Sequence, residues 1–355
     1  MKGMIMAAGV GSRLMPLTSD IPKPMVPMVN RPLMENTVHL LYEHGFHDLI
    51  ANLHYHASVI SDYFGDGSGY GVRMEFSLEE ELMGTAGGVK RCEWFLDESF
   101  VVVSGDALTD INLRALMDAH KKNGALATIA LKEVDEVEQF GVVVTDAEGR
   151  IKRFQEKPRA EEALSHTANT GIYVFEPEIF RYIPADQFYD FGKQVFPALV
   201  KMGAPFYGVE VDGYWCDVGS LETYRQAHID CLQGNVRLCN PKTIPGKREG
   251  NVLLGSGVQI GNNVDLRGYV ALGPGVVLED DVSIEDSVIW ERALIGKGSR
   301  LSNSVVGSHT VIKEESRLDA GAVIASYCTL EPSSHIPADA RVFRSVEGDL
   351  QVEHG

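Results

Sequence analysis

The sequence predicts an α/β domain with a mixed, mostly parallel sheet, followed by a parallel β-helix. Two observations carry this prediction. In roughly the first 230 of the 355 residues, short apolar segments alternate with helical patterns, as in proteins built from βαβ units. From Val252 onward, an aliphatic residue recurs at every sixth position, which is the period of a coiled, stacked repeat.

The alternating part is expected to contain short strands separated by helices. Strands are expected at residues 3–7, 49–53, 72–76 and 100–103. Helices are expected at 33–44 and 57–64, each followed by a glycine, and from near Thr85. A hairpin is expected from 142–144 and 150–155, and Asp110 is expected to cap a helix over 111–120. Because ligands bind beyond the carboxyl ends of parallel strands, the loop after residue 7 and Asp106 are expected to share one crevice.

The repeat covers sixteen positions from Val252 to Val342. Fifteen of them are aliphatic and one is Arg300, so the register is expected to run without an insertion or deletion. Neither a helix nor a strand selects every sixth residue, whereas three such hexads make one triangular coil. The pattern resembles the left-handed β-helix of hexapeptide-repeat proteins. Flat faces and an exposed last coil favour self-association, so a homo-oligomer is expected.

Composition and charge exclude several classes of protein. The net charge of −18 argues against a general binder of nucleic acids or of anionic membranes. The five cysteines form no C-x-x-C pair, which is typical of reduced thiols in the cytosol. The N-terminus lacks a signal-peptide pattern, and no stretch is long enough to cross a membrane. A cytoplasmic protein is therefore expected.

The loop after the first strand carries the features of a phosphate site. Gly9 and Gly11 would let backbone N–H groups approach phosphate oxygens. Arg13 and Lys23 would add fixed positive charge for a polyphosphate. The loop is neither a dinucleotide fingerprint, because Leu14 stands at the third glycine position, nor a Walker A loop.

The run Gly9-Val10-Gly11-Ser12-Arg13, with Pro22-Lys23-Pro24-Met25 after it, resembles the signature of the sugar-nucleotide pyrophosphorylases. The resemblance implies a Rossmann-like nucleotidyltransferase domain over residues 1–235, a linker over 236–250, the left-handed β-helix over 251–345 and a tail over 346–355. It also implies a transfer of a nucleotidyl group from an NTP to a sugar 1-phosphate.

The resemblance implies roles for individual residues. Arg13 and Lys23 would be catalytic, and Asp106 and Asp217 would hold Mg²⁺, a cation that prefers carboxylate and phosphate oxygens. The nucleotide-binding residues would be Ala7, Ala8, Gly9, Gly11, Ser12, Arg13, Gly84, Thr85 and Ala86. The sugar-phosphate-binding residues would be Gly141, Glu156, Lys157 and Asn169. Two of these residues have an alternative interpretation as helix caps. Thr85 could also cap its own helix. Asp217 could cap the helix containing Tyr224, but Ser220 is the better cap there.

Several functions remain open. The resemblance is nearest to the mannose-1-phosphate guanylyltransferases, which implies GTP and mannose 1-phosphate as substrates. The alternative substrates are glucose 1-phosphate with dTTP, UTP or ATP. A non-catalytic regulatory subunit is the alternative from another class, although Arg13, Lys23, Asp106, Lys157 and Asp217 are all retained. An acyltransferase would use His309 or His335 in the repeat, but a lone histidine without a matched partner does not favour it.

Overall fold

The computed structural model describes residues 1–237, 241–246, 250–345 and 347–354. The chain divides into two compact units. Unit 1 comprises Met1–Val10 and Met34–Asp217, and unit 2 comprises Gly11–Leu33 and Val218–Gly355. Unit 2 therefore contains two segments from the first 235 residues as well as the repeat. Parts of the predicted linker, at 238–240 and 247–249, lie outside the described residues.

A mixed sheet of nine strands forms the centre of unit 1, in the order β10-β9-β11-β6-β1-β4-β5, with β8 on β11 and β12 on β8. The run β6-β1-β4-β5 is parallel, while β11 is antiparallel to β6, β8 and β9. The strands are β1 (Lys2–Met6), β4 (Asp48–Leu53), β5 (Arg73–Leu78), β6 (Phe100–Ser104), β8 (Ala127–Glu133), β9 (Gly141–Thr145), β10 (Ile151–Glu156), β11 (Thr167–Phe175) and β12 (Phe206–Glu210). The α/β fold predicted for this part is thereby confirmed.

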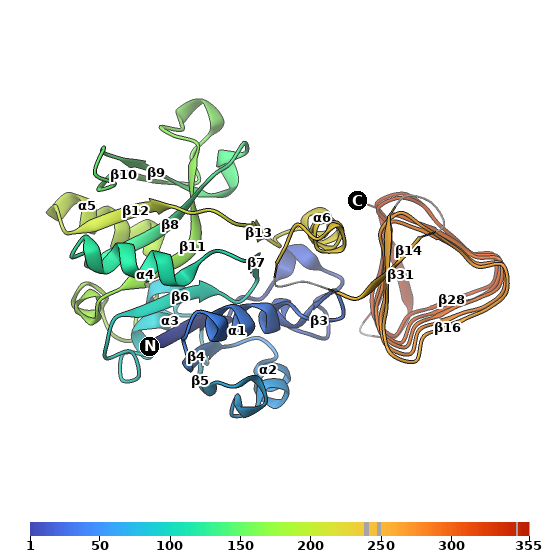
Figure 1. Cartoon of the computed structure of the whole chain (residues 1–355). Coiled ribbons are helices and arrows are strands. Elements are labelled where there is room, and N and C mark those ends of the chain that lie inside the picture. Colours follow the sequence, from blue (N-terminus) through green and yellow to red (C-terminus); the bar gives the residue numbers. More distant parts are fainter. Residues whose placement is uncertain (238–240, 247–249, 346, 355) are drawn as a thin grey trace. The chain divides into compact units, whose positions relative to one another are not determined.

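Five α-helices accompany the described sheet: α1 (Leu33–Glu43), α2 (Ala57–Phe64), α3 (Gly84–Arg91), α4 (Leu113–Lys122) and α5 (Phe196–Met202). The predicted helices at 33–44, at 57–64 and near Thr85 are confirmed, as Figure 1 shows. The predicted cap of α4 is wrong. Asn112 caps this helix by accepting the Ala115 N–H at 3.0 Å. Asp110 is buried and instead accepts the Tyr214 N–H at 2.7 Å, so its carboxylate belongs to a strand pairing.

The core of unit 1 is rich in aromatic rings. Phe175 stacks on Phe191, Phe191 on Phe196, and Phe196 on Phe206, with centroids 5.1 to 5.4 Å apart. Large rings bury much apolar area with few rotatable bonds, so they stabilise the sheet strongly. One buried polar group lies beside them: His120 bonds through its ring nitrogens to Thr128 and Glu176, and burial lowers its pKa.

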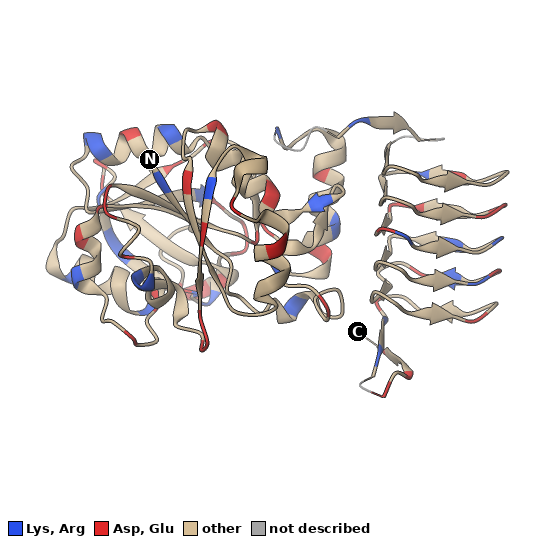
Figure 2. Ribbon diagram, turned by 90° about the horizontal axis from the view of Figure 1, so that it is seen from below, with Lys and Arg blue, Asp and Glu red and all other residues tan. Residues whose placement is uncertain are grey.

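The repeat in unit 2 forms a triangular parallel β-helix, seen along its axis in Figure 1 and from the side in Figure 2. Three sheets make its faces. The first contains β15 (Asn251–Leu254), β18 (Val270–Leu272), β21 (Val288–Ile289), β24 (Val305–Val306), β27 (Val323–Ile324) and β30 (Arg341–Arg344). The second contains β16 (Gln259–Ile260), β19 (Val277–Leu278), β22 (Leu294–Ile295), β25 (Val311–Ile312) and β28 (Thr329–Leu330). The third contains β17 (Asp265–Arg267), β20 (Ser283–Glu285), β23 (Arg300–Ser302), β26 (Arg317–Leu318) and β29 (His335–Ile336).

Two short strands extend the first face beyond the predicted limits of the repeat. β14 (Thr243–Pro245) pairs antiparallel with β15, within the segment expected as a linker. β31 (Leu350–Glu353) pairs antiparallel with β30, within the segment expected as a tail. Each end of this face is therefore covered by an antiparallel strand, which shields strand edges that would otherwise be open for pairing.

The expectation of an unbroken six-residue register is wrong. Val270 and Val252 pair at a spacing of eighteen residues, but Val288 pairs with Ala271 and Val305 with Val288, both at seventeen. Two successive coils are therefore each one residue shorter than the others. Both deletions fall at the corner between the third and first faces. The core positions Ile284 and Ile289 are five steps apart there, against six steps from Leu266 to Leu272.

A second aliphatic column hides these deletions in the sequence. In the first coils the positions two residues before the inward ones are also apolar and join the core, as Val264 and Val276 do. The series of every sixth residue from Val252 therefore starts in this second column, and it coincides with the inward positions only from Val306 onward. Between them it passes through Val288, Leu294 and Arg300, which lie outside the core cluster and precede the core residues Ile289, Ile295 and Leu301. Arg300 is exposed and marks the slipped register.

The remainder of unit 2 is built from the segment around Lys23 and from α6 (Leu221–Gln233). The predicted cap is confirmed: Ser220 accepts the Thr223 N–H at 3.1 Å in a capping box. Short elements occupy the earlier segment: two 3₁₀ turns (Ser12–Leu14 and Lys23–Met25), β2 (Pro27–Met28) and β3 (Arg31–Pro32). The His228 ring of α6 accepts the Val29 N–H at 3.2 Å, and Asn30 donates to the Leu272 carbonyl of the repeat at 2.9 Å.

Within the described part of the chain, no helix combines the length and the apolar character needed to cross a membrane.

Candidate functional site

A cavity of about 280 Å³ lies in unit 1 where β1 and β6 end. These strands are adjacent and parallel, with Met6 opposite Ser104, so the loops that follow them leave the same edge of the sheet. The cavity is lined by Met6, Ala8, Gly9, Asn52, Glu79, Leu82, Gly84, Thr85, Ser104, Asp106, Phe188 and Asp190. The crevice predicted from the sequence is confirmed, and five of the predicted site residues (Ala8, Gly9, Gly84, Thr85 and Asp106) share it.

A buried pair of polar side chains supports the floor of this cavity. Asn52 and Glu79 are only 4% and 2% exposed. Asn52 accepts the Ala7 N–H at 3.0 Å and donates to Glu79 at 2.7 Å, and Glu79 accepts the Met83 N–H at 2.9 Å. Buried polar groups must be paired to be tolerated, and these are. The network fixes the end of β1 to the residue that precedes α3.

The small residues at the start of α3 allow its backbone to approach the segment at 187–190. Gly84 has φ +73°, and a Cβ there would lie 2.6 Å from the Tyr189 carbonyl oxygen. The N–H groups of Ala86 and Gly87 both donate to this oxygen at 3.0 Å. A side chain at Gly84 would therefore push this segment away. Ala86 is fully buried and Ala7 nearly so, and the roles of both in nucleotide binding stay predictions.

The Thr85 side chain connects α3 to Asp190 and Phe191 rather than capping the helix. Its hydroxyl donates to the Asp190 carboxylate at 3.1 Å and accepts the Phe191 N–H at 2.9 Å. No side chain caps α3, whose N-cap residue is Met83, so the capping role considered for Thr85 is wrong. Asp190 also accepts the N–H groups of Gly192 and Lys193. Asp190 was not among the residues predicted from the sequence, although it lines the cavity.

A ribbon of two short strands, β7 (Ala107–Thr109) and β13 (Trp215–Asp217), places Asp106 and Asp217 at neighbouring backbone positions. In this antiparallel pair Asp217 lies opposite Ala107, the residue after Asp106. The Ser104 hydroxyl donates to the Asp106 carboxylate in a short hydrogen bond. The Trp215 indole donates to the Thr170 carbonyl at 2.9 Å, which anchors β13 to β11. The ribbon therefore places residues more than a hundred positions apart in the sequence at one end of the strand pair.

The donor set at this end suits a hard cation. Carboxylate oxygens are ligands that Mg²⁺ prefers, and Mg²⁺ usually takes only one or two carboxylates together with phosphate and water oxygens. Asp106 and Asp217 supply two such groups. No cluster of three or more His, Cys, Asp or Glu side chains with metal-binding geometry occurs among the residues that the structure describes. The remaining ligands would therefore have to come from substrate and solvent.

Three of the four residues predicted to bind the sugar phosphate lie on adjacent strands. Glu156 pairs opposite Gly141, and Ala168, the residue before Asn169, pairs opposite Val142. Asn169 accepts the Gly171 N–H at 2.9 Å and donates to the Tyr173 hydroxyl at 3.1 Å. These contacts hold its amide at an irregularity of β11. Lys157 follows Glu156 directly, is exposed, and has a left-handed backbone with φ +47°.

The electrostatic surroundings of Glu156 disfavour its charge. Burial raises the pKa of its carboxyl group, and Asp190 raises it further, against the opposing effect of Lys157 and Lys193. A Cβ at Gly192 would lie within 3 Å of the Glu156 carboxyl group. Glu156 therefore lies beside the segment that Thr85 and Asp190 fix to α3.

The loop after β1, which the sequence predicts to bind phosphate, continues into unit 2. Gly11 has φ +70°, and a Cβ there would lie 2.7 Å from the Cβ of Lys23, so only glycine allows this close approach. Thr18 donates to the Gly11 carbonyl at 3.0 Å. Lys23 is only 6% exposed, whereas Ser12 and Arg13 are exposed. The Arg13 guanidinium lies against Gly219, just before the cap of α6. The gathering of Arg13 and Lys23 with the residues of unit 1 stays a prediction.

Asn52 and Glu79 were missed by the sequence analysis, although a signal was present. An asparagine at the fourth position of an otherwise apolar strand, residues 49–53, is unusual because a buried amide needs partners. The sequence does not say which partners it has. Glu79 stands in a run of three glutamates, where a solvated surface is the ordinary expectation.

Comparison with known proteins gives matches along almost the whole chain. The model of the nucleotidyl transferase family matches residues 2–234, and that of the GMPPB C-terminal domain matches residues 248–343. A UTP–glucose-1-phosphate uridylyltransferase of Synechocystis sp. is 39% identical over 91% of each chain. A mannose-1-phosphate guanyltransferase of Aspergillus oryzae is 33% identical over 95% of this chain and 94% of the relative. The crystal structure of a Bacillus anthracis protein assigned as a glucose-1-phosphate thymidylyltransferase superposes with a TM-score of 0.60 at 27% identity, covering 64% of this chain and 94% of that one.

Proposed function

Because this chain belongs to the nucleotidyl transferase family and is a sugar-1-phosphate nucleotidyltransferase, we propose that it joins GTP and mannose 1-phosphate into GDP-mannose and pyrophosphate. The match of residues 248–343 to the GMPPB C-terminal domain carries the choice of substrates. Fungal relatives named mannose-1-phosphate guanyltransferases support it, since several match over most of this chain.

The proposed reaction is an in-line displacement. A phosphate oxygen of the sugar 1-phosphate attacks the α-phosphorus of the NTP, a new P–O bond forms, and the bond to the β-phosphate oxygen breaks, so that pyrophosphate leaves. The nucleophile is already an anion, so no general base is required. The protein then has to position two anionic substrates and stabilise the charge that moves to the leaving group.

The cavity in unit 1 supports the proposed nucleotide site. Gly9 and Ala8 line one part of it and Gly84 and Thr85 another, so a triphosphate and a base would be held between two loops. The apolar side chains of Leu82 and Phe188 line the same cavity and are 41% and 61% exposed. Exposed apolar groups beside a polar pocket suit contact with a nucleobase.

The catalytic cations are proposed to be Arg13 and Lys23. Arg13 would bind the β- and γ-phosphates and stabilise the departing pyrophosphate, and Lys23 would offset charge at the α-phosphate. Ser12 and Gly11 would present backbone N–H groups to the same phosphates. The close packing of Lys23 against Gly11 supports this role, because it fixes the root of the lysine side chain beside the loop.

Asp106 and Asp217 are proposed to hold Mg²⁺, which would shield phosphate charge and orient the α-phosphate when bound. On the sugar side, Lys157 would bind the sugar phosphate, and Glu156 and Asn169 would bond to sugar hydroxyls beside the Gly141 backbone. The strand pairing supports this arrangement, since Glu156 and Gly141 lie directly opposite each other on neighbouring strands.

A second substrate pair has its own supporting observation. The Synechocystis relative, named a UTP–glucose-1-phosphate uridylyltransferase, is 39% identical over 91% of this chain. Glucose 1-phosphate with UTP is therefore the alternative. Self-association through the β-helix is also proposed, because its faces are regular and a triangular coil presents flat surfaces.

The test is pyrophosphate release from a panel of GTP, UTP, dTTP and ATP, each with mannose 1-phosphate or glucose 1-phosphate and Mg²⁺. We expect the highest kcat/KM with GTP and mannose 1-phosphate. Lys23→Ala should lower kcat by orders of magnitude, because its charge acts on the transition state. A preference for UTP and glucose 1-phosphate would replace the proposed substrates, and a silent panel would favour a regulatory subunit.

A further inference from the structure

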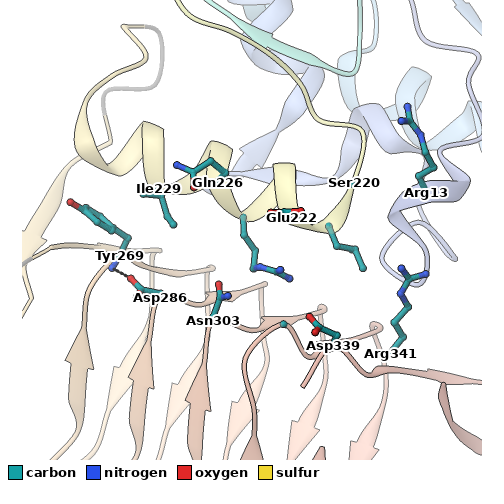
Figure 3. Close-up of a pocket in the computed structure, with 13 residues that line it drawn as sticks. Arg13, Ser220, Glu222, Gln226, Ile229, Tyr269, Asp286, Asn303, Asp339 and Arg341 are labelled. Atoms are coloured by element: carbon teal, nitrogen blue, oxygen red, sulfur yellow. Dashed lines mark hydrogen bonds between the residues drawn. The ribbon is translucent and has the colours of Figure 1, made fainter. Parts of the chain in front are cut away.

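Unit 2 contains a cavity of about 950 Å³ along α6. One wall is α6, and the opposite wall is the corner of the β-helix between its third and first faces, as Figure 3 shows. This is the corner at which two coils lack a residue, and Asp286 and Asn303 of these short corners line the cavity. The cavity is large enough for a small organic ligand.

Two arginines face this space from opposite walls. Arg225 comes from α6. Arg341 is the first residue of β30 and follows the corner that contains Asp339. Neither guanidinium forms a hydrogen bond or an ion pair with another residue in the described ranges of the chain. Burial lowers the pKa of Arg225, and the charges of Asp339 and Glu222 oppose this effect. Partly buried guanidinium groups whose N–H donors form no hydrogen bond within the protein are suited to bind a planar or tetrahedral anion.

The third arginine of the cavity has a different orientation. In Figure 3 the guanidinium of Arg13 points away from Arg341, and it lies against Gly219. Arg225 and Arg341 therefore supply the available positive charge, and Arg13 contributes to the wall. This separation matters because Arg13 is assigned to the nucleotide reaction, whereas Arg225 and Arg341 are not.

The rest of the lining is polar and partly apolar. Asp339, Asn303 and Gln226 offer oxygen acceptors and amide donors, and Ile229 and Tyr269 offer apolar surface. Asp286 accepts the Tyr269 N–H at 2.9 Å, which fixes the corner beneath the tyrosine. Carboxylates in the lining would repel a ligand that is anionic throughout. They would bind the hydroxyl groups of a ligand that carries its charge at one end.

We propose that this cavity is a second ligand site, which binds a sugar phosphate through Arg225 and Arg341. The phosphate group would lie between the two guanidinium groups. The hydroxyl groups would bond to Asp339 and Asn303, and one face of the sugar would contact Tyr269. This site uses none of the residues assigned to the nucleotide or to the sugar 1-phosphate of the reaction, apart from the wall contact of Arg13.

Binding is to be measured by calorimetry on the full chain, with mannose 6-phosphate, glucose 6-phosphate, mannose and inorganic phosphate as probes. The 6-phosphates lack the anomeric phosphate that the reaction requires, so they are not consumed, and the arginine variants separate binding at the second site from binding at the reaction site. Arg341→Gln and Arg225→Gln should each weaken binding of a sugar phosphate by about tenfold or more, since a charge-assisted hydrogen bond is lost. Arg300→Gln is the matched control, because Arg300 is an exposed arginine of the repeat that does not line the cavity.

Each outcome decides between the site and its absence. Loss of binding in Arg341→Gln, with unchanged binding in Arg300→Gln, supports the site even where Arg225→Gln fails to fold. The proposal is wrong when neither 6-phosphate binds up to about 10 mM, when both arginine variants bind as the parent does, or when inorganic phosphate binds as tightly as the sugar phosphates. Pyrophosphate release by Arg341→Gln, measured in parallel, reports separately on the proposed reaction.

Discussion

Trp290 of the β-helix donates its indole N–H to the hydroxyl of Tyr224 in α6 at 2.9 Å. Tyr224 in turn donates to the Pro27 carbonyl, four residues after Lys23. Both side chains are almost fully buried, and burial raises the pKa of Tyr224. One hydroxyl group therefore joins three parts of unit 2: the repeat, α6 and the segment that carries Lys23.

Replacing this hydroxyl should destabilise the protein. In Tyr224→Phe the Trp290 N–H and the Pro27 carbonyl lose their partner in a buried site, which costs about 1–3 kcal/mol. We expect a lower urea midpoint, measured by tryptophan fluorescence. Tyr182→Phe is the control, because Tyr182 is 37% exposed. Equal midpoints for the two variants would contradict the importance of the hydrogen bonds.

Acidification should destabilise the protein through His228. Burial lowers the pKa of His228 to about 4, below its ordinary value of 6.5. Between these values the unfolded chain binds more protons than the folded one, so this stability is present above pH 6.5 and is lost as the pH falls towards 4. The difference amounts to about 3 kcal/mol. His228→Gln should flatten the dependence of the urea midpoint on pH over this window, whereas replacement of an exposed histidine, His47→Gln, should retain the slope of the parent.

A side chain at Gly84 should impair nucleotide binding. Gly84→Ala would place a Cβ 2.6 Å from the Tyr189 carbonyl at φ +73°. Gly203 is the matched control, since it has a left-handed backbone with φ +66° and a Cβ there would meet no heavy atom within 4 Å, so Gly203→Ala carries only the backbone cost. That cost is about 1–2 kcal/mol. We expect Gly84→Ala alone to raise the KM for the NTP by about tenfold. A similar KM in both variants would show that the close approach at Gly84 does not shape the cavity.

Removal of one carboxylate should weaken the dependence on metal. Under the proposed mechanism, Asp217→Asn should raise the Mg²⁺ concentration needed for half-maximal rate by about tenfold or more. Asp110→Asn is the control on the same ribbon, because the asparagine oxygen can still accept the Tyr214 N–H. The measurement is the initial rate of pyrophosphate release against Mg²⁺ concentration. An unchanged metal requirement in Asp217→Asn would remove Asp217 from the metal site.

The crevice could be predicted from the sequence because it depends on a general property of parallel sheets. β1 and β6 are recognisable from their apolar runs, and their loops leave the same edge of the sheet. The approach of Asp217 to Asp106 could not be derived in the same way. It depends on β7 and β13, which have three residues each, too few to show a periodicity. Only the family resemblance linked these two aspartates.

The buried partners of the site were also beyond the sequence. The start of α3 was expected near Thr85, but the use of its hydroxyl by Asp190 and Phe191 depends on a segment a hundred residues away. Asp110 illustrates the converse error. Its place before a helical pattern indicated a cap, whereas the strand pairing with Tyr214 gave its carboxylate a buried partner, and Asn112 took the cap.

At the corner beside α6, the length of the backbone in the two shortened coils helps to set the shape of the cavity wall. Inserting one glycine after Asp286 would lengthen that corner from five steps to six and add backbone at a wall of the cavity. The other two corners and the stacked core could keep their pairing. Loss or gain of a single codon could thus widen or close this hollow during evolution, with every surrounding residue left unchanged.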